Sequence, residues 1–150
     1  MSMTFLSTKT YGAETGLSCA FRQWRADSHC NMLHGYALSV RFVWAGNLDE
    51  RNWVMDFGGL KELKAMLQQT FDHTCVVAAD DPELETFKGL HDRGIIDLRI
   101  MEGGVGAEMF AKWIAAQTLK WMDRTGASKR VQLVEVEVRE HGANSAICQP

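Results

Sequence analysis

Two long runs of alternating hydrophobic residues constrain the fold of this chain most. In "YALSVRFVWAG", residues 36–46, the side chains in phase are Tyr36, Leu38, Val40, Phe42 and Trp44. In "VQLVEVEVRE", residues 131–140, the even-numbered row is Val134, Val136, Val138 and then Glu140. Because successive side chains of a strand point to opposite faces, each run predicts a long strand with one buried face. A carboxylate therefore ends one of the apolar rows.

Shorter strands are predicted beside these two runs. Residues 4–11 and 16–23 form short alternating segments on either side of a turn at residues 12–16. The segments "WVMDF" (53–57) and "IIDLRIM" (95–101) have the apolar, β-branched or aromatic composition of short strands.

Three helices are predicted between the later strands. The segment 58–71 repeats apolar residues at helical spacing, and 107–123 carries a longer stripe that ends before Gly126. The segment 81–94 begins with Asp81 as a helix cap followed by Pro82, and Gly94 stops it. The stripe residues of the longest helix are Phe110, Trp113, Ile114, Gln117 and Trp121.

These elements predict the α+β class: an antiparallel sheet with helices packed on one face. The chain has 150 residues and two prolines, with no linker, so residues 1–150 are expected to form a single domain. The two edges of such a sheet need protection, and a closed ring of subunits is one way to provide it.

The charge pattern argues against nucleic-acid binding. The chain has 16 basic and 19 acidic residues, a net charge of -3, and no Lys/Arg block. No apolar run approaches the roughly 18 residues of a membrane span, and the start lacks a signal-peptide pattern, so we expect a cytoplasmic protein without a membrane partner. The four cysteines form no CxxC pair and are expected to be free thiols.

Two candidate groups for chemistry lie where the long strand begins. Cys30 is in a loop with His29, and a nearby imidazole favours the thiolate, which is a usable base or nucleophile. His34 and Tyr36 are two residues apart and point to the same face. Two histidines at these positions would indicate zinc, whereas His34 alone is either a single metal ligand or a structural histidine.

Three acidic residues and one more histidine complete the candidates. Asp72 and His73 follow the first helix, where the carboxylate either fixes the tautomer of a catalytic imidazole or merely ends the helix. Glu140 is aimed at the apolar face and needs hydrogen-bond donors, unless the strand end has already reached solvent. Glu108 opens the longest helix, a place where the helix dipole favours an acid in any case.

Six blocks in order resemble the 6-pyruvoyltetrahydropterin synthase and 6-carboxytetrahydropterin synthase family. They are "LSCAFR", "CNMLHGY", "WVMDFGGLKELK", "FDHT", "GAEMFAKWI" and "VEVRE". The resemblance implies the tunnelling fold, in which subunits join four-stranded antiparallel sheets into a barrel. It also implies a homohexamer of two stacked trimers, with active sites between neighbouring subunits.

The resemblance further implies a lyase acting on the pterin 7,8-dihydroneopterin triphosphate. Glu140 matches the glutamate that holds the pterin, Cys30 the catalytic cysteine, and Asp72 with His73 the acid/base pair, contributed from an adjacent subunit. Glu108 matches a glutamate with a role in the polar pocket. The 6-carboxytetrahydropterin synthase type would serve deazapurine formation, as in queuosine biosynthesis.

The chain departs from this family at the metal site. The resemblance implies zinc, bound by one histidine in an "AAHR"-like strand and two in "HGH", whereas this chain has "CAFR" and "HGY". Phe21 and Tyr36 thus replace two of three ligands, and His34 alone cannot hold catalytic zinc in the family manner. A rearranged site of His34, Cys19 and His29 is the alternative left open.

Three functions are compatible with these residues. The first is the pterin synthase or lyase; the second is a divergent, metal-independent enzyme acting on a pterin or purine; the third is a non-catalytic pterin-binding protein. The basic residues Lys9, Arg22 and Arg25 line a triphosphate site or cover a solvated face, and we predict the solvated face.

Overall fold

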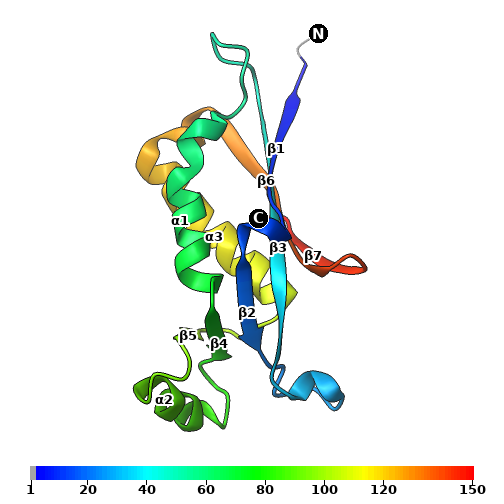
Figure 1. Cartoon of the computed structure of the whole chain (residues 1–150). Coiled ribbons are helices and arrows are strands. Elements are labelled where there is room, and N and C mark those ends of the chain that lie inside the picture. The colour runs from blue at the N-terminus through cyan, green and yellow to red at the C-terminus, as the bar shows by residue number, and fades with distance from the viewer. Residues whose placement is uncertain (1–2) are drawn as a thin grey trace.

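The computed structural model describes residues 3–150, and its seven strands form one open sheet (Figure 1). The strand order is β5-β4-β2-β3-β6-β7, with β1 also paired to β3. The strands are β1 (Phe5–Tyr11), β2 (Leu17–Phe21), β3 (His34–Gly46), β4 (Thr74–Ala78), β5 (Leu98–Met101), β6 (Val131–His141) and β7 (Asn144–Cys148).

Strand β3 organises the sheet because it is long enough to pair with several partners. Strands β1 and β2 follow one another along the same edge of β3, separated by the 3-10 turn Ala13–Thr15. Strand β6 pairs along the other edge. The first residues of β3 therefore lie beside the end of β2.

The sheet is larger and more mixed than the predicted four-stranded antiparallel sheet. Strands β1, β3, β6 and β7 are antiparallel, but β2 pairs with β4 and β4 with β5 in parallel. Neither β4 nor β7 was predicted. All five residues of β4, "TCVVA", are buried, so this strand has no exposed face to produce an alternating pattern.

The three predicted helices are present: α1 (Lys61–Phe71), α2 (Leu84–Asp92) and α3 (Ala107–Thr125). Helices α1 and α3 lie together on one face of the sheet (Figure 1). Helix α1 buries Leu63, Leu67 and Phe71, and α3 ends at Gly126, whose φ of 82° is the left-handed conformation that glycine adopts readily.

The predicted strand at residues 53–57 is wrong. That segment is a loop leading into the 3-10 helix Phe57–Leu60, and the Asp56 carboxylate accepts a hydrogen bond from the Gly58 backbone N–H at 2.9 Å. A short polar side chain that bonds its own backbone favours a turn over a strand ladder. Two further 3-10 helices are His29–Asn31 and Ala127–Lys129.

A β-bulge changes the predicted phase of β6. Val43 pairs with Glu135 and Trp44 pairs with Leu133, so Val134 has no partner. Leu133 takes the buried position and Val134 is only half-buried, which corrects the predicted even-numbered row. Beyond the bulge, Val136 and Val138 are buried as expected, and Glu140 is half-buried.

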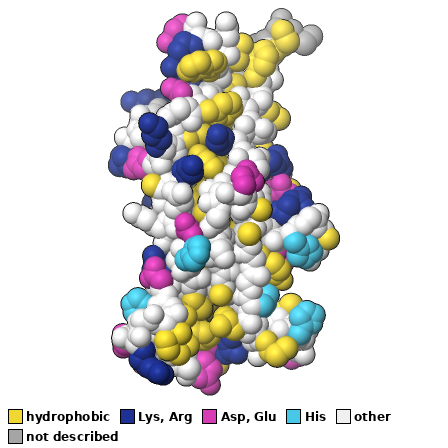
Figure 2. All heavy atoms as spheres, viewed as in Figure 1, with side chains coloured by type: hydrophobic (Ala, Val, Ile, Leu, Met, Phe, Trp, Pro, Cys, Tyr) yellow, Lys and Arg dark blue, Asp and Glu magenta, His cyan; other side chains and the backbone are white. Residues whose placement is uncertain are grey.

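The surface charges, the helices and the cysteines add three findings. On the face shown in Figure 2, basic and acidic side chains are interspersed rather than gathered into one basic area. Within residues 3–150, no helix combines the length and apolarity needed to cross a membrane. All four cysteines are free, with Cys19 and Cys75 buried and the other two half-buried.

Candidate functional site

A cluster of three rings lies where β2 ends and β3 begins. Phe21 pairs with His34 across the two strands, and Cys19 pairs with Tyr36. The ring centroids of Phe21 are 5.1 Å from His34 and 5.9 Å from Tyr36, and the last two rings are 5.3 Å apart. We call Phe21, His34 and Tyr36 the aromatic cluster.

Phe21 contributes a buried apolar ring to the cluster. Its side chain is 1% exposed, and its ring meets the edge of Phe110 on α3 at 5.1 Å. His34 donates its Nδ1 hydrogen to the carbonyl oxygen of Met32 at 2.8 Å, so Nε2 is the ring nitrogen that keeps a lone pair for a metal. Of the three ligand positions that zinc would need, one offers a nitrogen. These residues do not fit zinc bound in the family manner.

The rearranged metal site predicted as an alternative does not form within one chain. Cys19 is 2% exposed, and burial raises the pKa of its thiol to about 12. His29 is exposed in the loop before β3. Across residues 3–150, no three His, Cys, Asp or Glu side chains come together as a metal site.

Cys30 lies in the 3-10 turn His29–Asn31, which is tied back to the end of β2. The Gln23 backbone N–H donates to the carbonyl oxygen of Cys30 at 2.9 Å, and Cys30 N–H donates to Ser28 Oγ at 3.3 Å. The Asn31 side chain donates to the carbonyl oxygen of Trp24 at 2.7 Å. These bonds fix the turn that carries the half-buried thiol to the segment that directly follows β2.

Arg22 anchors the same loop, a role that the sequence did not reveal. Its guanidinium makes two hydrogen bonds to Asp81, at 2.7 and 2.9 Å, and a third to Asn31 Oδ1 at 3.2 Å. The Asp81 side chain is 1% exposed, and the hydrogen bonds from Arg22 hold its pKa below the usual range. The prediction that Arg22 covers a solvated face is therefore wrong. Its partner Asp81 is 59 residues away, and no local sequence pattern links the two residues.

The other two basic candidates remain near the surface. Arg25 pairs with Asp80 at 2.7 Å, with both side chains largely exposed. The ammonium group of Lys9 lies 5.4 Å from the centre of the Tyr11 ring. Neither contact builds a triphosphate site.

The two glutamates predicted to bind substrate line one hollow of about 340 Å³. Glu140 and Glu108 share it with Ala107, Ala143, Asn144 and Ser145. Glu140 is half-buried at an irregularity in the β6–β7 pairing, between Arg139 and His141. Helix α3 begins at Ala107, so its positive end lies beside both carboxylates.

Tyr36 lies at the same end of the sheet as Cys30 and Glu140, where β3 begins and β6 ends. Burial raises the pKa of its phenol most, and the charges of Glu140 and Cys30 raise it further. Its ring is 5.8 Å from that of His141, the neighbour of Glu140 in β6. The fold therefore places Cys30, Tyr36 and Glu140 around one end of the sheet.

Asp72 and His73 form the expected contact with each other. His73 Nδ1 and Asp72 Oδ1 are 2.6 Å apart, and the carboxylate fixes the tautomer that leaves Nε2 free. His73 has a φ of 55° and its side chain is 87% exposed. In the described part of one chain, no hydrogen bond or ion pair joins this pair to Cys30.

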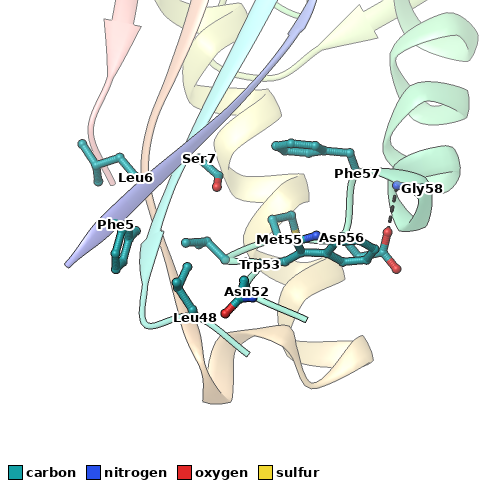
Figure 3. A pocket seen from close by; sticks show the side chains of 11 residues that line it. Phe5, Leu6, Ser7, Leu48, Asn52, Trp53, Met55, Asp56, Phe57 and Gly58 are labelled. Atoms are coloured by element: carbon teal, nitrogen blue, oxygen red, sulfur yellow. Dashed lines mark hydrogen bonds between the residues drawn. The ribbon is translucent and has the colours of Figure 1, made fainter. Parts of the chain in front are cut away.

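A larger hollow of about 510 Å³ lies at the opposite end of β3, between β1 and the loop before α1 (Figure 3). Its lining includes exposed apolar side chains from both segments: Phe5, Leu6, Leu48, Trp53 and Phe57. Phe5 pairs with Gly46 at the far end of β3, whereas the aromatic cluster is at its start. This hollow is separate from the candidate site.

Comparison with known proteins identifies the relatives of this chain. The model of a family described as 6-pyruvoyl tetrahydropterin synthase matches residues 11–150. A 6-carboxy-5,6,7,8-tetrahydropterin synthase of Aquifex aeolicus is 27% identical over 134 residues, which cover 87% of this chain and 82% of the relative.

Solved structures share the fold. An uncharacterized protein from Wolinella succinogenes has a TM-score of 0.84 at 17% identity, with 99% of each chain covered. The 6-pyruvoyltetrahydropterin synthase of Plasmodium vivax, in a form whose catalytic glutamate is replaced by cysteine, has a TM-score of 0.72 at 17% identity, also with 99% of each chain covered.

Proposed function

Since the chain belongs to the 6-pyruvoyl tetrahydropterin synthase family, we propose that it is a pterin-pathway lyase of the 6-carboxytetrahydropterin synthase type. Its proposed substrate is 7,8-dihydroneopterin triphosphate. The observation that carries this proposal is that Cys30, Tyr36 and Glu140 lie at the same end of the sheet, with Glu108 in the same hollow as Glu140.

Glu140 is proposed to hold the pterin ring. A carboxylate accepts charge-assisted hydrogen bonds from neighbouring N–H groups, and the amino and ring N–H groups of a pterin offer such a pair. The hollow beside Glu140 and Glu108 has about 340 Å³, within the range of roughly 300–1,000 Å³ typical of small-molecule sites. These hydrogen bonds would fix the pterin ring by the edge that carries its N–H groups.

Cys30 is proposed to act on the side chain of the bound pterin, as a base that removes a proton from carbon or as a nucleophile. Asp72 and His73 are proposed to relay the proton, with Nε2 of His73 as the exchanging atom. The exposure of His73 supports a role toward the site of a neighbouring subunit rather than its own.

Zinc has no part in these steps, because Phe21 and Tyr36 stand at two of the three positions where the family has ligands. This observation favours a second candidate function, a metal-independent enzyme acting on another pterin or purine. A non-catalytic pterin-binding protein is the third candidate, and it needs only Glu140 and the sheet.

A homo-oligomer, with two trimers stacked as a hexamer, is proposed as the functional assembly. Within the described chain, β1 pairs only with β3 and β7 only with β6, so each leaves one edge free. Exposed apolar side chains border the β1 edge, including Leu6 and Trp53 at 63% and 44% exposure.

We also propose that the protein is located in the cytoplasm.

Two measurements test the function. Fluorescence titration with neopterin should show binding that Glu140→Gln weakens at least tenfold, whereas Glu102→Gln, at an exposed position, leaves it unchanged. Turnover of 7,8-dihydroneopterin triphosphate should be lost in Cys30→Ala and kept in Cys148→Ala, a change at another half-buried thiol. Binding without turnover by the wild-type protein would favour the third candidate.

A further inference from the structure

Tyr36 is held in place by rings on several sides. Phe21 and His34 lie at centroid distances of 5.9 and 5.3 Å, and His141 lies at 5.8 Å. Phe21 is itself locked against Phe110 in the core. A tyrosine packed in this way has few orientations, so the direction of its hydroxyl group is set by the fold.

Within residues 3–150, no hydrogen bond joins the Tyr36 hydroxyl group to another residue. The ring hydrogen bonds at this end of the sheet join His34 to Met32, and His141 to Ala143 and Asn144. A half-buried tyrosine usually pairs its hydroxyl group. The hydroxyl group is not among the buried unpaired side-chain atoms of residues 3–150, so it is free to bond water or a ligand.

The phenol is a hydrogen-bond donor at neutral pH. An ordinary tyrosine already has a pKa of about 10. A phenol therefore carries its proton at neutral pH.

The positions of Glu140 and Cys30 say which part of a ligand Tyr36 would meet. Under the proposed function, Glu140 holds the pterin ring and Cys30 faces the reacting carbon of the side chain. Tyr36 lies near both: its ring is 5.8 Å from that of His141, which follows Glu140, and 5.9 Å from that of Phe21, at the strand end to which the Cys30 turn is bonded. A ligand that reaches both groups would therefore pass close to the Tyr36 hydroxyl group. The atoms between the ring edge and the reacting carbon are those of the side chain, with its hydroxyl oxygens.

We propose that the Tyr36 hydroxyl group donates a hydrogen bond to an oxygen of the pterin side chain and selects ligands that carry one. This inference rests on the proposed pterin site and extends it to the part of the ligand beyond the ring. Tyr36 would thus supply a donor to the side chain from a position where the family has a metal ligand.

The test compares two ligands on three proteins, by fluorescence titration. Pterin has no side chain and neopterin has a trihydroxypropyl side chain, so their affinity ratio reports contacts to the side chain alone. The wild-type protein should prefer neopterin roughly tenfold, the effect of one well-placed hydrogen bond. Tyr36→Phe should abolish this preference while leaving the affinity for pterin unchanged, and Tyr11→Phe, a change in the other tyrosine of the chain, should retain it.

The outcomes separate this inference from the function on which it rests. If the wild-type protein binds neither ligand, the pterin site itself is wrong. If it binds both and Tyr36→Phe keeps the preference for neopterin, or if the wild-type protein shows none, the role of Tyr36 is wrong and the pterin site stands. An unchanged melting temperature of Tyr36→Phe would show that the lost preference does not come from altered packing.

Discussion

Phe21, the last residue of β2, lies directly opposite His34 on β3, with their ring centroids 5.1 Å apart. This contact decides how the end of the sheet is built. A histidine in place of Phe21 would point a nitrogen toward His34, whereas the phenyl ring joins the site to the hydrophobic core through Phe110. The same side chain therefore links the candidate site to the stability of the fold.

The aromatic cluster can be converted into a zinc site. In Phe21→His with Tyr36→His, three imidazoles would share one face of β2 and β3, the ligand set and spacing that zinc accepts. Elemental analysis should find about one zinc per chain in this double variant and far less in the wild-type protein or in either single variant. Circular dichroism checks that the double variant is folded.

A wild-type protein with about one zinc per chain, purified without tag or chelator, would contradict the argument made from the aromatic cluster. It would mean that a neighbouring subunit completes the ligand set around His34.

Phe21→Ala should destabilise the protein strongly. The side chain is 1% exposed and touches three other rings, so its removal leaves a cavity that costs about 3–5 kcal/mol in the free energy of unfolding. Leu119→Ala is the control because Leu119 is 38% exposed on α3, and its loss should cost less than about 1 kcal/mol. Urea denaturation measures both, and equal losses would contradict the assigned core position.

Arg22→Ala should lower stability by about 3 kcal/mol at neutral pH, because it leaves the carboxylate of Asp81 buried without its partner. The effect depends on pH. Asp81 has a pKa depressed below its ordinary value of 3.8 in the folded protein, so the stability it contributes with Arg22 is present above about pH 4.

That contribution is lost as the pH falls through the folded pKa, since the protonated carboxyl no longer attracts the guanidinium. Denaturation curves of both proteins from pH 7 to pH 2 should therefore converge in acid. Arg25→Ala serves as the control because its pair with Asp80 is exposed, and a gap between wild type and Arg22→Ala that stays constant into strong acid would argue against this account.

Alkylation of the native protein should distinguish the four thiols. Burial raises the pKa of Cys19 to about 12 and that of Cys75 to about 11, so both should resist iodoacetamide, while the half-buried Cys30 and Cys148 react. Neopterin should protect Cys30 and leave Cys148 reactive, as peptide mass spectrometry would show. Equal protection of both cysteines would show that Cys30 is not part of the pterin site.

The free edge of β1 should be covered in the assembled protein. Light scattering should give the mass of six chains for the wild-type protein, and Trp53→Ser in the apolar hollow of Figure 3 should shift it to smaller species. Leu119→Ser changes another exposed apolar side chain, on α3, and should leave the mass unchanged. A monomeric wild-type protein would refute the proposed assembly.

Local pattern was enough for much of the fold. The period-two run at residues 36–46 became β3, the helical spacing from Leu60 to Phe71 became a 3-10 turn and α1, and Gly126 ended α3 as predicted. Prediction from the hydrophobic pattern failed where every residue of a strand is buried. It also failed where a side chain hydrogen-bonds to the neighbouring backbone. Strand β4 is buried throughout and shows no alternation, and Asp56 turned the expected strand at 53–57 into a capped turn.

By itself, the sequence determined the α+β class, the family through its ordered blocks, and the identity of Cys30, His34 and Glu140 as candidates, because these follow from residue type and spacing along the chain. Only the tertiary structure decided what surrounds them. Pairing of β2 with β3 set Phe21 against His34, pairing of β3 with β6 brought Tyr36 to the same end of the sheet as Glu140, and Asp81 met Arg22 across 59 residues. Such contacts depend on strand register and long-range packing, which no local pattern encodes.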